Sequence, residues 1–183
     1  DIQRLLPQVM EFNKTPRRPL AILYPDPVQP RMLAYFPVHD LVQTALTKMG
    51  YACDYVTEKR VAMGNLKDYK MLVMPAADYI RDDTYAAVTQ FVNNGGVAVV
   101  LGTPPLHDEM NRARDAAFFE NGNSANTLID VDGLQARKIS QGKGKIYLLT
   151  NIAATTKDST EVQATNVKLT QDFLEKVTQK ELP

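Results

Sequence analysis

The group of side chains best suited to chemistry in this sequence is His107-Asp108-Glu109, a histidine followed by two carboxylates. Such a group can serve general acid–base catalysis or bind a divalent cation. Neighbouring residues of a helix point in different directions, however, and Asp108 suits the N-cap of a helix. We therefore interpret this cluster, and likewise His39-Asp40, as a capped and solvated helix start. A hydrolase that uses His107 with Asp108 or Glu109, with or without a metal, is kept as an alternative.

The only cysteine, Cys53, and the turn Gly142-Lys143-Gly144-Lys145 are the other motifs that suggest chemistry. Cys53 lies in a predicted strand, with neither a helix N-terminus nor a basic neighbour to lower the pKa of its thiol, so we interpret it as a buried structural residue. The glycine-rich turn precedes a strand, whereas a phosphate-binding loop leads from a strand into a helix. We interpret it as a hairpin turn or a turn that leads into a strand. Because Pro25-Asp26-Pro27 is a poor phosphate nest, we predict no flavin site, and we predict no other cofactor and no metal.

Apolar runs that end in proline or glycine alternate with amphipathic segments along the chain. The apolar runs predict strands over Leu20–Tyr24, Tyr51–Val56, Met71–Pro75, Val97–Leu101 and Lys145–Leu149. The amphipathic segments predict helices over Val38–Met49, Asp82–Val92, Asp108–Phe119 and Val167–Val177. Gly50 and Gly95 suit left-handed helix ends. The predicted fold class is therefore α/β, a three-layer, mostly parallel, flavodoxin-like sheet with helices on both faces.

The loops that follow the predicted strands hold most of the remaining candidate ligand-binding residues. In an open parallel sheet, ligands bind beyond the carboxyl ends of the strands, near the point where the strand order reverses. The residues that we expect to face a ligand there are Asp26, Glu58, Asp78, Thr103 and His107.

Composition limits the classes of partner. The 183 residues suit one domain, and 21 Lys and Arg balance 21 Asp and Glu. Because the formal net charge is zero, we expect no nucleic-acid partner. Because the sequence has no apolar run of about 20 residues, we expect no membrane partner. A single cysteine does not decide the redox compartment, so the localisation stays open.

The first nineteen residues differ in character from the rest. Apolar residues recur at helical spacing in Asp1–Asn13, and Lys14–Pro19 is basic and contains two prolines. Because the chain does not start with methionine, we expect an upstream domain. We predict that residues 1–19 are a helix and linker leading from that domain, and that residues 20–183 form the α/β domain.

Several short motifs together resemble a known family. They are Leu20–Tyr24, Met49-Gly50-Tyr51, Asp68–Pro75, Phe91–Gly96 and Gly142–Tyr147. In this combination the chain resembles the β-galactosidase trimerisation domain, the middle domain of certain glycoside hydrolases, whose fold is similar to class I glutamine amidotransferases. The resemblance covers about Leu20 to Leu149 and implies a domain that follows a catalytic barrel.

The resemblance also indicates what the chain lacks. Catalytic amidotransferases place a cysteine in the turn after the strand that corresponds to Val97–Leu101, and this sequence has Gly102-Thr103-Pro104 there. The resemblance therefore implies a non-catalytic accessory domain of a β-galactosidase-like glycoside hydrolase, which serves subunit assembly or shapes a carbohydrate site. The partners implied are an upstream catalytic barrel, other copies of the chain and a carbohydrate. A small-ligand-binding flavodoxin-like domain is the alternative.

Overall fold

The structure is a computed structural model that describes residues 18–25, 35–115, 117–120, 127–131, 134–150, 152 and 160–182. One sheet contains seven strands in the order β2-β1-β3-β4-β7-β6-β5. The strands are β1 Leu20–Tyr24, β2 Asp54–Thr57, β3 Met71–Pro75, β4 Val97–Leu101, β5 Thr127–Val131, β6 Leu134–Gln141 and β7 Gly144–Leu149. The helices are α2 Tyr35–Lys48, α3 Glu58–Ala62, the short 3₁₀ helix η1 Asn65–Asp68, α4 Asp82–Asn93, α5 Ala117–Glu120 and α6 Thr160–Glu181.

The predicted fold class is confirmed. β2, β1, β3, β4 and β7 pair in parallel, and only β6 and β5 run antiparallel to their neighbours. All five residues of β3 and of β4 are buried, as expected for central parallel strands covered on both faces.

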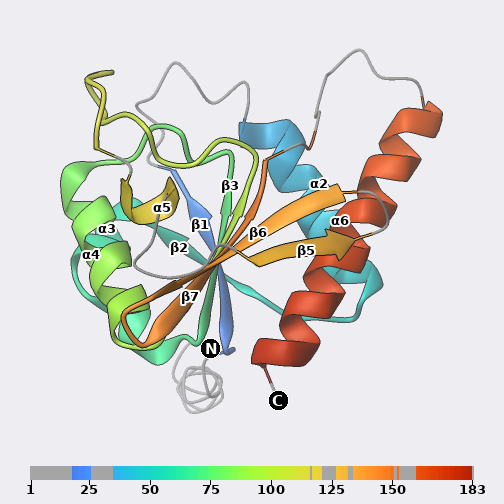
Figure 1. Ribbon diagram of the computed structural model, residues 1–183, viewed down its shortest axis with the longest axis horizontal. Coiled ribbons are helices and arrows are strands. Elements are labelled where there is room, and N and C mark those ends of the chain that lie inside the picture. The colour runs from blue at the N-terminus through green and yellow to red at the C-terminus, as the bar shows by residue number, and fades with distance from the viewer. Residues whose placement is uncertain are drawn as a thin grey trace, which may run out of the picture.

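Helices cover both faces of the sheet, so the domain has three layers (Figure 1). Alternate residues of β1 show the division: Leu20 and Ile22 belong to a core that includes residues of α2 and α6. Ala21 and Leu23 belong to a second core, with residues of α3, η1, α4 and α5. None of the described helices combines the length and the apolar character that a membrane span requires.

Two helices end as their glycines predict. Gly50 (φ +70°) follows α2, where its N–H donates to Thr47 O at 3.0 Å and the N–H of the next residue donates to Leu46 O at 2.9 Å. Gly95 (φ +110°) follows α4 with the same pair of bonds, to Val92 O and Phe91 O. Both are Schellman motifs, which stop the helix and turn the chain toward the next strand.

Three predicted boundaries need correction. The segment Asp108–Phe119 was expected to be a helix, but its described residues hold only the one-turn α5, because Asp108 closes a local turn instead of capping a helix. Helix α2 already includes Tyr35, so His39-Asp40 lies in its second turn and not at a helix start. The second strand begins at Asp54 rather than Tyr51, because Tyr51 takes part in the end of α2.

The antiparallel pair β5–β6 was not predicted. β6 pairs with both β5 and β7 and continues the sheet beyond its parallel part. The turn at Gly142-Lys143 joins β6 to β7, with Gln141 paired to Gly144, which confirms the hairpin interpretation. The predicted N-terminal helix, most of the linker and Asp26 lie outside the described residues, so the division of the chain at residue 19 stays a prediction.

The start of β1 and the end of α6 lie at the same edge of the sheet (Figure 1). Pro19 O, just before β1, accepts hydrogen bonds from Lys70 N at 2.8 Å and Met71 N at 3.0 Å. Glu181, the last residue of α6, accepts bonds from Lys145 Nζ at 2.7 and 2.9 Å and from Tyr147 Oη at 2.6 Å. Its side chain is only 7% exposed. This carboxylate fixes the last turn of α6 to β7.

Candidate functional site

The turns at the carboxyl edge of the sheet lie beside the reversal of strand order between β1 and β3. Ala76, directly after β3, has a positive φ of +41°, and Gly102, directly after β4, has φ +84°. Ala76 N donates to Leu101 O at 2.7 Å, and Gly102 N donates to Leu149 O at 2.8 Å. A non-glycine residue in this backbone region is strained, and such strain concentrates at functional sites. Backbone hydrogen bonds thus fix both turns at this edge of the sheet.

Asp78 and His107 contact each other next to these two turns. His107 Nδ1 lies 2.9 Å from Asp78 Oδ1, and the backbone N–H of His107 donates to Asp78 O at 3.0 Å. The Tyr79 ring stacks on the imidazole with a centroid distance of 5.0 Å and an interplanar angle of 22°. When Nδ1–H donates to the carboxylate, Nε2 keeps its lone pair. This arrangement can take up a proton or accept a hydrogen bond from a hydroxyl group.

Arg114 holds the His107 loop in place. Its guanidinium donates to His107 O at 3.0 Å and to Ile80 O at 2.9 Å, and it pairs with Asp82 at 2.5 Å. The guanidinium carbon also lies 4.6 Å from the centroid of the Tyr85 ring. One largely buried side chain therefore ties the loop after β4 to the start of α4, which keeps the imidazole in position.

Asp108 is not the partner of His107. Its Oδ1 accepts hydrogen bonds from Met110 N at 2.9 Å and Arg112 N at 2.7 Å, and its Oδ2 pairs with the Arg112 guanidinium. Burial alone would raise the pKa of the Asp108 carboxyl, but the bonds from Arg112 and Met110 outweigh it and lower the pKa. Glu109 is exposed. The alternative that pairs His107 with Asp108 or Glu109 therefore has no matching contact among the described residues, and His107 contacts Asp78 instead.

The other predicted ligand-facing residues divide into two groups. Thr103 is exposed at the carboxyl edge, as expected. Glu58 is fully buried at the start of α3, where Oε2 accepts from Arg81 N at 2.8 Å and the backbone carbonyl accepts from Thr84 Oγ1 at 3.3 Å. The Glu58 carboxylate therefore joins α3 to the start of α4, away from solvent.

An aromatic cluster beside β1 and β2 was not foreseen. Tyr35 lies between Tyr24, in an edge-to-face contact at 5.8 Å, and the stacked ring of His39 at 5.3 Å. His39 Nε2 lies 3.1 Å from Tyr55 Oη, and His39 Nδ1 lies 3.2 Å from Asp40 Oδ1. Burial, followed by the nearby Cys53 and Asp40, raises the pKa of Tyr55, so its hydroxyl stays protonated. These residues come from three separate elements, which is why no sequence spacing indicated them.

Cys53 belongs neither to the Asp78–His107 pair nor to the aromatic cluster. It lies just before β2, near the amino edge, and packs partly buried against the core beneath α2 and α6. Burial raises the pKa of its thiol, and this effect outweighs the opposing influence of Arg18. The thiol is therefore poorly suited to nucleophilic chemistry, in agreement with the structural role expected for it. No three His, Cys, Asp or Glu side chains gather as a metal site among the residues that the structure describes.

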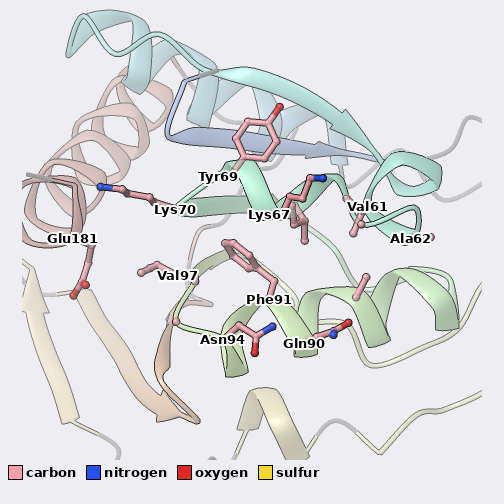
Figure 2. Close-up of a pocket in the computed structure, with 15 residues that line it drawn as sticks. Val61, Ala62, Lys67, Tyr69, Lys70, Gln90, Phe91, Asn94, Val97 and Glu181 are labelled. Carbon is pink, nitrogen blue, oxygen red and sulfur yellow. The ribbon is translucent and has the colours of Figure 1, made fainter. Parts of the chain in front are cut away.

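A cleft of about 700 Å³ lies at the amino edge of the sheet (Figure 2), and its lining includes neither Asp78 nor His107 nor Tyr55. Lys67 and Lys70 come from one wall, and Phe91 of α4 and Asn94, directly after α4, come from the other. A Cβ at Gly96 would lie 2.4 Å from the Phe91 ring, so this ring packs directly on the glycine. The ionisable residues of the cleft lining are Lys67, Tyr69, Lys70 and Glu181.

Comparisons with known proteins match the fold. No protein-family model and no curated protein matches this sequence. A catalytic mutant of Gan42B, a GH42 β-galactosidase from G. stearothermophilus, superposes with a TM-score of 0.63 at 14% identity, over 89% of this chain and 30% of that chain. A β-galactosidase from Bacillus circulans sp. alkalophilus gives 0.61 at 12% identity, over 97% of this chain and 33% of that chain. This chain thus spans about a third of these enzymes.

A third similar structure is matched over nearly its whole length. The cytoplasmic protein STM1381 from Salmonella typhimurium LT2 superposes with a TM-score of 0.54 at 10% identity. The match covers 86% of this chain and 99% of that one. The same fold therefore occurs both as part of longer glycoside hydrolases and as nearly the whole of a shorter protein.

Proposed function

We propose that this chain is a non-catalytic accessory domain of a glycoside hydrolase of the β-galactosidase kind, serving subunit assembly or the shaping of a carbohydrate site. The observation that carries the proposal is the coverage of the matches. Between 89% and 97% of this chain superposes on a part that makes up 30% to 33% of two β-galactosidases. The rest of such an enzyme has room for a catalytic barrel of about 250 residues, which this chain does not contain.

The turn after β4 supports a role without covalent chemistry. Gly102-Thr103-Pro104 occupies the position where amidotransferases of this general fold carry a cysteine, and the only cysteine lies near the opposite edge. Burial also raises the pKa of the Cys53 thiol, which makes it a poorer nucleophile. We therefore assign hydrolysis to an upstream barrel.

Hydrolysis tests the first part of the proposal. The longest natural protein that contains this chain, and the chain alone, would each be incubated with p-nitrophenyl β-D-galactopyranoside and with the corresponding mannoside and glucoside. We expect the long protein to release nitrophenol from one of these and the chain alone to release none. Turnover by the chain alone, lost in His107→Ala, would overturn the accessory role.

Light scattering tests the assembly role. The molar mass of the chain would be measured over a concentration series, beside a version extended upstream of Asp1. A discrete oligomer of either version supports assembly through this domain. If both versions are monomeric at every concentration, the assembly role is wrong, and shaping of a carbohydrate site is left as the accessory function.

A second candidate is a stand-alone ligand-binding domain. The nearly complete match to STM1381 favours it, as does the Asp78–His107 pair at the edge where open parallel sheets bind ligands. A monomeric natural protein without glycosidase activity, whose His107 NMR signals shift with a small ligand, would favour this candidate over the first.

A further inference from the structure

The aromatic cluster next to β1 and β2 exposes two rings to solvent. Among the described residues four large apolar side chains are strongly exposed, and the two aromatic ones, Phe36 at 45% and Tyr55 at 43%, both belong to this cluster. Phe36 contacts Tyr35 and Tyr55 contacts His39, and the Tyr35 and His39 rings stack on each other, so both exposed rings belong to one series of ring contacts. Exposed apolar side chains gathered in one region commonly mark a binding surface. The two rings therefore need an explanation beyond packing.

Tyr35 and His39, which contact the two exposed rings, are themselves held in place by packing and hydrogen bonds. Tyr35, only 4% exposed, donates its hydroxyl to Leu23 O at 3.1 Å and contacts Phe36 edge to face at 5.6 Å. The same tyrosine stacks on His39, which in turn contacts Tyr55 at 5.6 Å. A surface whose supporting side chains are fixed by packing and hydrogen bonds loses little entropy when it binds a ligand.

The cluster also has a polar edge. When His39 Nδ1–H donates to Asp40, Nε2 accepts the Tyr55 O–H, so the lone pairs of the phenol oxygen are left to accept a further bond. The Asp40 side chain is 74% exposed, and its carboxylate can accept hydrogen bonds from two hydroxyl groups. Flat apolar faces thus lie beside several hydrogen-bond acceptors.

We propose that Phe36, Tyr55 and Asp40 form a binding surface for the pyranose ring of a neutral sugar. A pyranose presents an apolar C–H face, which packs on an aromatic ring, and a rim of hydroxyl donors, which suits the carboxylate and the phenol oxygen. A phosphorylated ligand is disfavoured because the Asp40 carboxylate would repel it. The choice of a sugar rests on the proposed function, which connects this fold with carbohydrate hydrolysis.

The test is an NMR titration of the isotope-labelled chain with methyl β-D-galactopyranoside. We expect shifts at Phe36, His39 and Tyr55, with a Kd of about 1–10 mM, as is typical of a single weak site. Tyr55→Ala should weaken binding by about 3- to 10-fold through loss of the aromatic contact. Tyr55→Phe, which keeps the ring, should weaken it less. Met110→Ala, which removes an exposed apolar side chain from another surface, is the matched control and should change nothing.

Three results would overturn the inference: no shifts at high sugar concentration, shifts that Tyr55→Ala leaves unchanged, or shifts confined to the surroundings of His107. If Tyr55→Ala instead abolishes self-association of the chain and no sugar shift is seen, the surface is a contact between copies. Far-UV circular dichroism of each variant checks that the fold is intact.

The titration is independent of the hydrolysis assay. If sugar binds at Tyr55 but the longest natural protein that contains this chain hydrolyses no glycoside, the proposed role in a hydrolase is refuted and the sugar-binding surface is supported. An active long protein whose domain shows no shifts would refute only the sugar site.

Discussion

The buried carboxylate at the end of α6 allows a quantitative prediction. Glu181 accepts three hydrogen bonds from Lys145 and Tyr147, and its side chain is 7% exposed. Glu181→Gln keeps the shape, removes the charge and leaves the ammonium group without its counter-ion. Breaking a fully buried pair costs about 3–5 kcal/mol, and because Lys145 is 35% exposed and can be hydrated, we expect a loss of about 2–3 kcal/mol.

The loss should depend on pH in a defined direction. Burial by itself would raise the pKa of Glu181, but the bonds from Lys145 and Tyr147 outweigh it and hold the pKa below the ordinary value of 4.5. A carboxyl whose pKa is lowered on folding stabilises the protein fully above its unfolded pKa. The contribution is lost as the pH falls through the lower value of the folded state. The difference between the wild type and Glu181→Gln should therefore be constant near neutral pH and shrink below pH 4.5.

Urea unfolding followed by far-UV circular dichroism measures this loss, since the chain has no tryptophan to serve as a fluorescent probe. For a domain of this size the expected loss corresponds to a fall in Tm of about 5–10 °C. Glu175→Gln, on an exposed face of the same helix, is the matched control and should stay within about 0.5 kcal/mol of the wild type. If Glu181→Gln matches this control, or if its deficit does not change below pH 4.5, the reasoning about the buried pair is wrong.

Three further predictions concern the β7 turn, the candidate site and the cysteine. A Cβ at Gly144 would lie 2.2 Å from two backbone carbonyl oxygens, so Gly144→Ala should lose about 3 kcal/mol or more in the same urea assay, and a near-neutral result would contradict this packing. Asp78→Ala should move the His107 proton from Nδ1 toward Nε2 in long-range ¹⁵N NMR spectra, and an unchanged tautomer would show that the carboxylate does not orient the ring. Because burial raises the pKa of its thiol, Cys53 should react with a disulfide reagent at least about tenfold more slowly in the native chain than in urea, and equal rates would refute its burial.

The central strands could be predicted because their apolar runs are continuous. Val97–Leu101 and Met71–Pro75 agree with the structure, since strands buried on both faces contain no polar residue that would blur their limits. Gly50 and Gly95 fixed two helix ends for an equally local reason. In these parts of the chain, neighbours in sequence decide the conformation.

The β5–β6 pair was not predicted from the sequence. Only the central strands, which helices cover on both faces, need a continuous apolar run, and β5 and β6 lie outside that part of the sheet. A signal was present, since Asp132-Gly133 between two strand-like segments is a common hairpin dipeptide. The expected helix from Asp108 was wrong for a related reason: the aspartate side chain bonds to backbone N–H groups equally well in a turn.

The candidate site was predictable only in part. The edge of the sheet and the residues Asp78 and His107 followed from strand order and the position of loops. Their pairing did not, because it joins two loops 29 residues apart, and His107 has two nearer carboxylates in sequence. The pairing of His39 with Tyr55, from a helix and a strand, was equally hidden.

The position of Pro19 and Glu181 at one edge of the sheet affects how such a unit can be exchanged between genes. Because β1 is entered and α6 is left at that one edge, a longer polypeptide can contain this fold with both connections on one side of the sheet. The opposite edge, with Asp78 and His107, then stays free of these connections. Its loops can diverge in sequence while the junctions and the sheet stay the same.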